Sequence, residues 1–172
     1  PNMMALIAPI ALLVAIIHTL NRLSGDSELI VMTAGGGTIW KKADLDAITA
    51  IARDHGLITH MDGARLMNAS VALGVDASEI AQYTDSVGFC VSKGLSAPVG
   101  SVLCGTKAFI ERARTFRRMV GGNMRQAGPL AAAGIVALEN MVVRLPEDHR
   151  TAKRLAVGLN KIDASIVDPA LI

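Results

Sequence analysis

The sequence is poor in aromatic and charged side chains for its length. Aromatic residues make up 3% of the 172 residues and charged residues 19%, whereas 51% are hydrophobic. A chain of this length can form one domain with a substantial core. Aliphatic runs without aromatic anchors are typical of an α/β domain, whose parallel strands are buried on both faces. The net charge of +2 is too small for a strongly basic nucleic-acid-binding protein, so no nucleic-acid partner is expected.

Cysteine is also scarce. The two cysteines, Cys90 and Cys104, lie inside apolar runs. They lack the close paired spacing of a metal-binding knuckle, so no metal site is expected. Both are predicted to be small, reduced core residues of a cytoplasmic protein.

Charge is missing altogether from residues 1–21, which contain no Asp, Glu, Lys or Arg. A stretch of this length could cross a bilayer. It lacks a basic leading region, contains Pro9 and His18, and does not begin with methionine, and all three features argue against a span or a signal peptide. We therefore predict a buried helix or a poorly formed remnant and no membrane association, with a membrane span as the alternative.

Strand and helix patterns alternate along the rest of the chain. Strands are predicted at residues 29–32, 57–62, 86–91 and 101–104, and helices at 41–55, 65–73, 76–83, 109–120, 128–140 and 147–159. Helix, glycine and strand follow one another as in a βαβ crossover, which predicts a mostly parallel sheet flanked by helices. We divide the chain into an apolar segment at 1–28, part of a large domain at 29–145, and a helix leading toward a further domain at 146–172.

The helix predicted at 109–120 is amphipathic. Ile110, Ala113, Phe116 and Val120 recur at helical spacing and are predicted to face inward. The arginines between them then form an outer face, which we interpret as solvated.

One lysine lies between two apolar runs in residues 86–104. The first run leads into Ser92 and Lys93, a loop rich in Gly, Ser and Pro follows, and the second run leaves that loop. A lysine at a strand end on the edge of a core is desolvated, which lowers its pKa toward the neutral form that can condense with a carbonyl. Alternatively, the side chain leaves the strand only to reach water.

A carboxylate, Asp62, ends the preceding strand, 31 residues before Lys93. In a doubly wound sheet both side chains open onto one crevice. An amine for a Schiff base and a carboxylate for a pyridinium nitrogen are what pyridoxal phosphate requires of a protein. Arg65 then offers a planar fork for a substrate carboxylate. The spacing indicates equally well an alternative in which Asp62 and Arg65 form only a local ion pair at the start of the next helix.

Five stretches carry a family resemblance. They are His-Met-Asp-Gly-Ala-Arg at 60–65, Cys-Val-Ser-Lys-Gly-Leu at 90–95, Ala-Pro-Val-Gly-Ser at 97–101, Gly-Gly-Asn-Met-Arg-Gln-Ala-Gly at 121–128 and Arg-Leu-Pro-Glu-Asp-His at 144–149. In this order they resemble the low-specificity L-threonine aldolases of the aromatic amino acid beta-eliminating lyase/threonine aldolase family. The resemblance implies an α/β fold, the central part of a fold-type I large domain, with the N-terminal part and the C-terminal small domain missing.

The resemblance also implies roles for five side chains. Lys93 is the expected Schiff-base lysine for pyridoxal 5'-phosphate, and Asp62 is expected to hold the pyridine nitrogen. Arg65 is expected to bind the substrate carboxylate. Arg125 is expected near the cofactor phosphate, where a neighbouring subunit can supply it. Arg118, where many relatives have lysine, is assigned to substrate binding.

The implied activity is a retro-aldol cleavage of L-threonine or L-allo-threonine to glycine and acetaldehyde, in threonine catabolism and glycine biosynthesis, by a homo-oligomeric (dimeric or tetrameric) lyase. Two alternatives stay open: a β-elimination on the same scaffold, and a truncated paralogue that only folds and self-associates. One departure bears on catalysis. The family's Glu-Asn-Thr-His-Asn stretch reads Ile-Val-Met-Thr-Ala at 30–34, so its histidine is missing.

Overall fold

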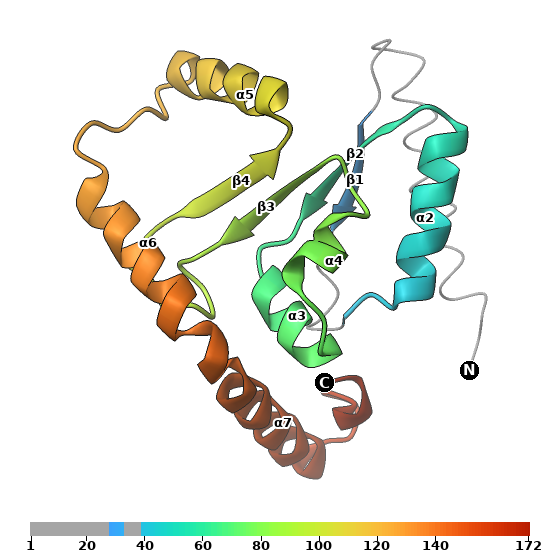
Figure 1. Ribbon diagram of the computed structural model, residues 1–172. Coiled ribbons are helices and arrows are strands. Elements are labelled where there is room, and N and C mark those ends of the chain that lie inside the picture. The colour runs from blue at the N-terminus through green and yellow to red at the C-terminus, as the bar shows by residue number, and fades with distance from the viewer. Residues whose placement is uncertain (1–27, 33–38) are drawn as a thin grey trace.

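The computed structural model describes residues 28–32 and 39–172, which fold around a four-stranded sheet (Figure 1). The strands, in spatial order, are β1 (Glu28–Met32), β2 (Ile58–Asp62), β3 (Ser86–Cys90) and β4 (Ser101–Gly105). The first three run parallel, and β4 returns antiparallel to β3. The predicted strands and the mostly parallel sheet are therefore confirmed. The N-terminal apolar segment and the glycine-rich turn after β1 lie outside the described residues.

Helices connect and flank these strands. They are α2 (Lys42–Asp54), α3 (Leu66–Leu73), α4 (Ala77–Ala81), α5 (Lys107–Met119), α6 (Gly128–Asn140) and α7 (Leu145–Ile162), with short 3-10 turns at Val142–Arg144 and Pro169–Leu171. The predicted helices are all present within a few residues of their expected bounds. The last begins earlier than expected, at Leu145, because Pro146 occupies its first turn, where no backbone N–H is needed.

The core lies between one face of the sheet and the helices packed on it. Along β2, Thr59 and Met61 are buried while Ile58 and Asp62 are exposed, the alternation of a strand covered on one side. The core residues are Leu45, Ile48, Ala52, Met61, Leu66, Ile80, Val87, Phe89, Val91, Leu95, Ala97, Ala137 and Leu145. They come from the sheet, the loop after β3 and helices α2, α3, α4, α6 and α7.

The edge strand β4 departs from the expected burial. All five of its residues are exposed, so Cys104 is exposed, and Cys90 on β3 is only partly buried. The prediction that both cysteines are core residues is therefore wrong. The reason is positional: β4 is the last strand of the sheet and gains little cover from the described helices.

Helix α5 also differs from its prediction. It reaches the sheet at its first turn, where an added Cβ at Gly105 would lie 2.7 Å from the Phe109 ring. Farther along, Phe116 is 57% and Val120 80% exposed, so the inward orientation expected for these two side chains is wrong. Their apolar stripe exists but is not covered.

Within the described part of the chain, no single helix has the length and apolar character to cross a membrane. The bent pair Gly128–Asn140 and Val142–Ile162, with a 45° angle, meets the criterion by length and composition alone.

Candidate functional site

Asp62 and Lys93 come from neighbouring parallel strands. Asp62 is the last residue of β2 and pairs in register with Gly88 of β3. The chain leaves β3 at Cys90 and reaches Lys93 three residues later. Both residues therefore follow strands at the same, carboxyl edge of the sheet, where α/β proteins bind ligands. This part of the site prediction agrees with the topology.

Glycine lets the turn after β2 stay close to β3. The Gly63 N–H donates to the Gly88 carbonyl at 2.8 Å, and the Cys90 N–H donates to the Ala64 carbonyl at 3.2 Å. A Cβ on Gly63 would lie 3.2 Å from the Val87 side chain and 3.3 Å from the Gly88 oxygen. Pairing of the two strands thus continues past Asp62 and fixes the backbone on which its carboxylate is carried.

The backbone of Lys93 is equally constrained. The Lys93 carbonyl accepts a hydrogen bond from the Ser96 N–H at 2.9 Å, which closes a tight turn. Leu95, 2% exposed, anchors that turn in the core. On the helix side, a Cβ on Gly94 would lie 2.6 Å from Asn68 Oδ1 of α3. The loop is therefore held between β3 and α3.

The Lys93 side chain is exposed, as are those of Asp62 and Arg65. The predicted desolvation of the Lys93 side chain is therefore wrong. Nothing in the Gly, Ser and Pro loop can shield the amine, since its one large apolar anchor, Leu95, points into the core.

Arg65 shares this edge. It is the N-cap residue of α3, three positions after Asp62, and its carbonyl accepts the Ala69 N–H at 3.1 Å. The edge thus carries an amine, a carboxylate and a guanidinium. Its role in binding a substrate carboxylate stays a prediction, with an ion pair to Asp62 as the alternative.

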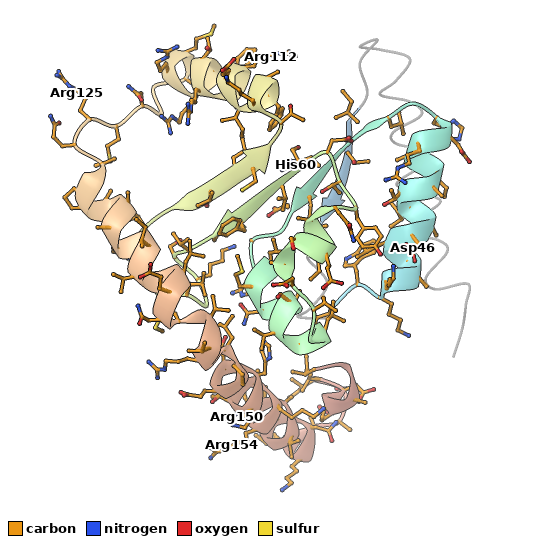
Figure 2. All side chains as sticks on the ribbon, in the orientation of Figure 1. Asp46, His60, Arg112, Arg125, Arg150 and Arg154 are labelled. Carbon is orange, nitrogen blue, oxygen red and sulfur yellow. The ribbon has the colours of Figure 1, made fainter. Side chains whose placement is uncertain are left out.

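The other two predicted residues lie elsewhere. Arg118 is in the last turn of α5, and Arg125 is in the loop between α5 and α6, where Figure 2 shows its side chain pointing away from the sheet. Helix α5 follows Gly105, which pairs with Ser86 at the opposite end of β3 from Lys93. The described chain does not bring these arginines to Asp62 and Lys93, and a subunit-bridging role for Arg125 stays a prediction.

His60 is a neighbour of the site that the sequence argument missed. It lies two residues before Asp62 on β2, so the two side chains are on the same face of the sheet. Its Nδ1 is 2.9 Å from Ser86 Oγ, and its Nε2 is 3.8 Å from the position of a Cβ on Gly88. The imidazole therefore spans from β2 to β3 beside Asp62. The available signal was the two-residue spacing between His60 and Asp62.

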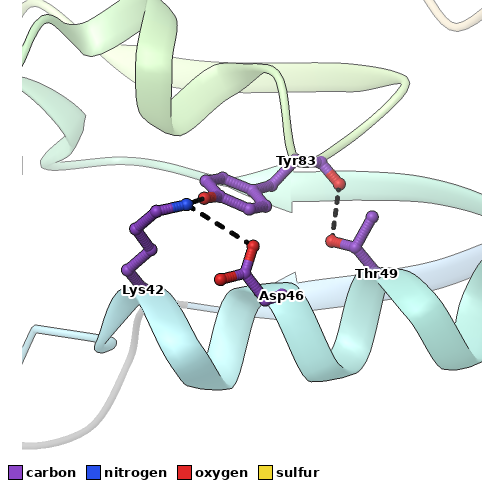
Figure 3. Close-up of polar contacts among 4 residues, drawn as sticks. All are labelled: Lys42, Asp46, Thr49 and Tyr83. Carbon is purple, nitrogen blue, oxygen red and sulfur yellow. Dashed lines mark hydrogen bonds and ion pairs between the residues drawn. The ribbon is translucent and has the colours of Figure 1, made fainter.

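Helix α2 is tied to the segment before β3 by a separate polar cluster (Figure 3). The Lys42 amine donates to the Tyr83 hydroxyl and lies 3.6 Å from Asp46 Oδ1. The Tyr83 hydrogen bond, followed by the Asp46 charge, raises the pKa of Lys42. The Thr49 hydroxyl donates to the Tyr83 carbonyl at 3.1 Å. These contacts hold the crossover helix to the sheet and have no predicted catalytic role.

The chemical groups at the carboxyl edge are those that pyridoxal phosphate requires of a protein. The amine of Lys93 suits the aldehyde, and the carboxylate of Asp62 suits the ring nitrogen. The backbone is closely packed at Gly63 and Gly94, where an added Cβ would be crowded, so the backbone that carries Asp62 and Lys93 is fixed. The exposed edge leaves these groups accessible to a ligand. The donor set is thus consistent with this cofactor.

Family and structural relatives agree with this geometry. Residues 26–171 match the family model of the beta-eliminating lyases, and the chain belongs to that family. Residues 1–41 match a different model, that of the lipopolysaccharide export system permease LptF/LptG. The N-terminal segment thus differs in its similarity from the rest of the chain, and the two matches overlap at residues 26–41.

Individual relatives narrow the similarity to threonine aldolases. The chain is 51% identical to the probable low-specificity L-threonine aldolase 2 of Arabidopsis thaliana, over 74% of this chain and 36% of that protein. It is 47% identical to the low specificity L-threonine aldolase of Escherichia coli K12, over 76% of this chain and 39% of that protein. It therefore spans between a third and two fifths of these relatives.

A solved structure shows the same fold. A Listeria monocytogenes protein, provisionally named an L-allo-threonine aldolase, superposes with a TM-score of 0.71 at 26% identity, covering 77% of this chain and 38% of that one. The described sheet and helices are therefore part of a fold-type I domain, as predicted.

Proposed function

We propose that this chain is the cofactor-binding part of a pyridoxal-phosphate-dependent aldehyde-lyase that cleaves L-threonine or L-allo-threonine to glycine and acetaldehyde by a retro-aldol reaction. The observation that carries the proposal is the pair Asp62 and Lys93 at the ends of neighbouring parallel strands. The 47–51% identity to low-specificity L-threonine aldolases supports the choice of substrate.

Each residue at the edge has a chemical task in this proposal. Lys93 holds the cofactor through its amine, and Asp62 keeps a proton on the ring nitrogen by pairing with it. When bound, pyridoxal phosphate supplies an electron sink for the bond that breaks at the substrate Cα. Arg65 orients the substrate carboxylate with its planar fork. No described side chain is assigned as the base for the β-hydroxyl proton, and water fills that role.

We also propose that the enzyme acts in the cytoplasm as a homo-oligomer, in threonine catabolism and glycine biosynthesis. Support for an oligomer comes from Arg125: an arginine that the resemblance places near the cofactor phosphate points away from the sheet of its own chain. A second chain would be needed to bring such a residue to Lys93.

The test is covalent capture of the cofactor. Purified protein mixed with pyridoxal phosphate should show a visible absorbance band, and borohydride reduction followed by peptide mass spectrometry should place the adduct on Lys93. Lys93→Ala should lose the band and the adduct, whereas Lys107→Ala, which removes an exposed lysine at the start of α5, should keep both. Asp62→Asn should keep the adduct but lower cofactor affinity.

Product analysis then separates the alternatives. Acetaldehyde and glycine from L-threonine support the aldolase, whereas pyruvate from L-serine without threonine cleavage would support a β-elimination. A wild-type chain that forms no adduct on Lys93 would overturn the proposal and favour the non-catalytic paralogue.

A further inference from the structure

A cavity that is open to solvent lies along the second half of α5 and the turn that follows it. It has a volume of about 450 Å³ and is lined by Glu111, Arg114, Thr115, Arg117, Arg118 and Asn123. This volume is enough for a small ligand, and because all six lining side chains are exposed, such a ligand would stay partly in contact with water. Of these residues, only Arg118 was assigned a role by the family resemblance.

The turn after α5 shapes this cavity. Gly121 has a φ of +76°, a conformation that favours glycine, and reverses the chain. The Gly122 N–H then donates to the Arg117 carbonyl at 2.8 Å, and a Cβ on Gly122 would lie 3.1 Å from Arg117 Cγ. As a result the chain folds back on its helix, and Asn123 returns beside Arg117. Gly121 and Gly122 thus allow the turn that brings Asn123 into the lining of the cavity.

Asn123 orients one guanidinium. Arg117 Nη2 donates to Asn123 Oδ1 at 3.3 Å, which limits the rotation of the Arg117 side chain. Arg118 Nη2 lies 3.5 Å from the hydroxyl of Thr115, a second polar group of the lining. Both guanidinium groups keep further N–H donors for a ligand, because each carries five.

The lining is positively charged on balance. It carries the guanidinium groups of Arg114, Arg117 and Arg118 against the single carboxylate of Glu111. That carboxylate lies 4.0 Å from the Lys107 amine, one turn earlier on α5. Among the described residues, no carboxylate lies within ion-pair distance of the three guanidinium groups. The helix dipole favours positive charge in the last turn of α5, which accounts for Arg117 and Arg118. It does not account for Arg114 or for the hydrogen bond between Arg117 and Asn123.

We propose that this cavity binds a phosphoryl group, either as free inorganic phosphate or carried on a small molecule. Arg114 and Arg117 are its main ligands, and Asn123 is a positioning residue that holds Arg117. Planar guanidinium groups match the oxygens of a phosphoryl group in paired hydrogen bonds. The cavity is larger than one phosphate requires, so the larger ligand is expected to bind more tightly.

The experiment is titration of the full chain with inorganic phosphate and with glucose 6-phosphate, followed by calorimetry or phosphorus NMR. Arg114→Gln and Arg117→Gln should each weaken binding by about tenfold or more, since each removes charged hydrogen bonds. Arg117→Lys should weaken it as well, because it keeps the charge and loses the fork. Asn123→Ala should weaken it by a smaller factor. Circular dichroism checks that each variant is folded.

Arg112→Gln is the matched control. It removes the same charge from the same helix at a residue outside the lining (Figure 2), and binding should change by less than about twofold, because its guanidinium is not one of the proposed ligands. If glucose 6-phosphate binds more tightly than phosphate and glucose does not bind, the ligand is a phosphoryl group carried on a small molecule. If phosphate binds more tightly than glucose 6-phosphate, the ligand is free phosphate.

Two results would overturn the inference. One is no saturable binding of either probe by the wild-type chain. The other is that Arg112→Gln and Arg117→Gln weaken phosphate binding equally and also weaken binding of a single-stranded oligonucleotide equally. That result would mean that the helix binds anions through a diffuse basic surface. Lys93→Ala should bind both probes as the wild-type chain does, so this outcome is independent of the proposed lyase activity.

Discussion

At the scale of single residues, Asp85 joins the two strands that lead to the candidate site. Its Oδ2 accepts hydrogen bonds from the Thr59 N–H at 2.7 Å and from the Thr59 hydroxyl at 2.8 Å. Its own N–H donates to the Thr59 carbonyl at 3.1 Å. The Thr59 N–H and then the Thr59 hydroxyl lower the pKa of Asp85 below its usual 3.8. The folded protein therefore favours the ionised carboxylate.

We expect Asp85→Asn to destabilise the protein in a pH-dependent way. Because the folded-state pKa lies below the unfolded-state value, ionised Asp85 contributes stability above about pH 4, and this contribution is lost as the pH falls through the folded-state pKa. Replacing it should lower the free energy of unfolding by about 1 kcal/mol at pH 7, a modest value because the carboxylate is exposed. The difference should shrink at pH 3.

Urea unfolding at the two pH values measures this effect. Glu139→Gln, an exposed carboxylate on α6, is the control and should change stability little at either pH. An Asp85→Asn penalty of the same size at pH 3 and pH 7 would show that the carboxylate charge is not the cause.

At the scale of elements, the loop that carries Lys93 depends on a close contact with α3. A Cβ on Gly94 would lie 2.6 Å from Asn68 Oδ1 and 3.1 Å from Leu145 Cδ2. The Asn68 amide also donates to Asp148 at 3.2 Å, which links the contact to α7. The loop, α3 and the start of α7 thus share one packing point.

Gly94→Ala should therefore displace the loop or the Asn68 side chain. We expect a loss of about 1–3 kcal/mol in stability, the range for an overpacked contact, together with weaker labelling of Lys93 by pyridoxal phosphate. Adding Asn68→Ala should restore part of both, because it removes the nearest atom. Thermal unfolding and the borohydride adduct are the two readouts.

Gly158→Ala in α7 is the matched control. Apart from the backbone of its own helix and its chain neighbours, nothing lies within 4 Å of an added Cβ there, and the residue is inside α7. Alanine should stabilise that helix by up to about 1 kcal/mol and leave Lys93 labelling unchanged. If Gly94→Ala behaves like Gly158→Ala, the packing argument for the loop is wrong.

The positions of the helices and strands could be predicted from the sequence, but the burial of their side chains could not. Gly56, with a φ of +62°, marks the end of α2 as the pattern indicated, and β2 follows directly. The parallel topology then placed Asp62 and Lys93 at one edge. In contrast, the exposure of Lys93, Cys104 and Phe116 was not predictable. Periodicity identifies an apolar face, yet it does not say whether another element packs on that face.

At the scale of the whole molecule, apolar side chains remain uncovered on α5, α6 and α7 and on the segments that join them. The exposed large residues there include Phe116, Met119, Val120, Met124, Ile135, Val136, Val143, Leu155 and Ile162, between 55% and 80% exposed. Exposed apolar side chains in this number are typical of interaction sites or of a tendency to aggregate. The chain covers only 36% and 39% of the two threonine aldolases compared above, so these relatives contain more chain that can cover such surface.

We therefore expect the 18.0 kDa chain to self-associate through these helices. Light scattering should give a mass above that of one chain and rising with concentration. Replacing both Met119 and Val120 by Gln should lower the mass, because these side chains, 73% and 80% exposed, have little structural role within the chain. Ile51→Gln, on α2 and far less exposed at 36%, is the control and should leave association unchanged. A wild-type chain of constant 18.0 kDa mass at all concentrations would contradict the expectation, and with it the proposal that a second chain supplies Arg125.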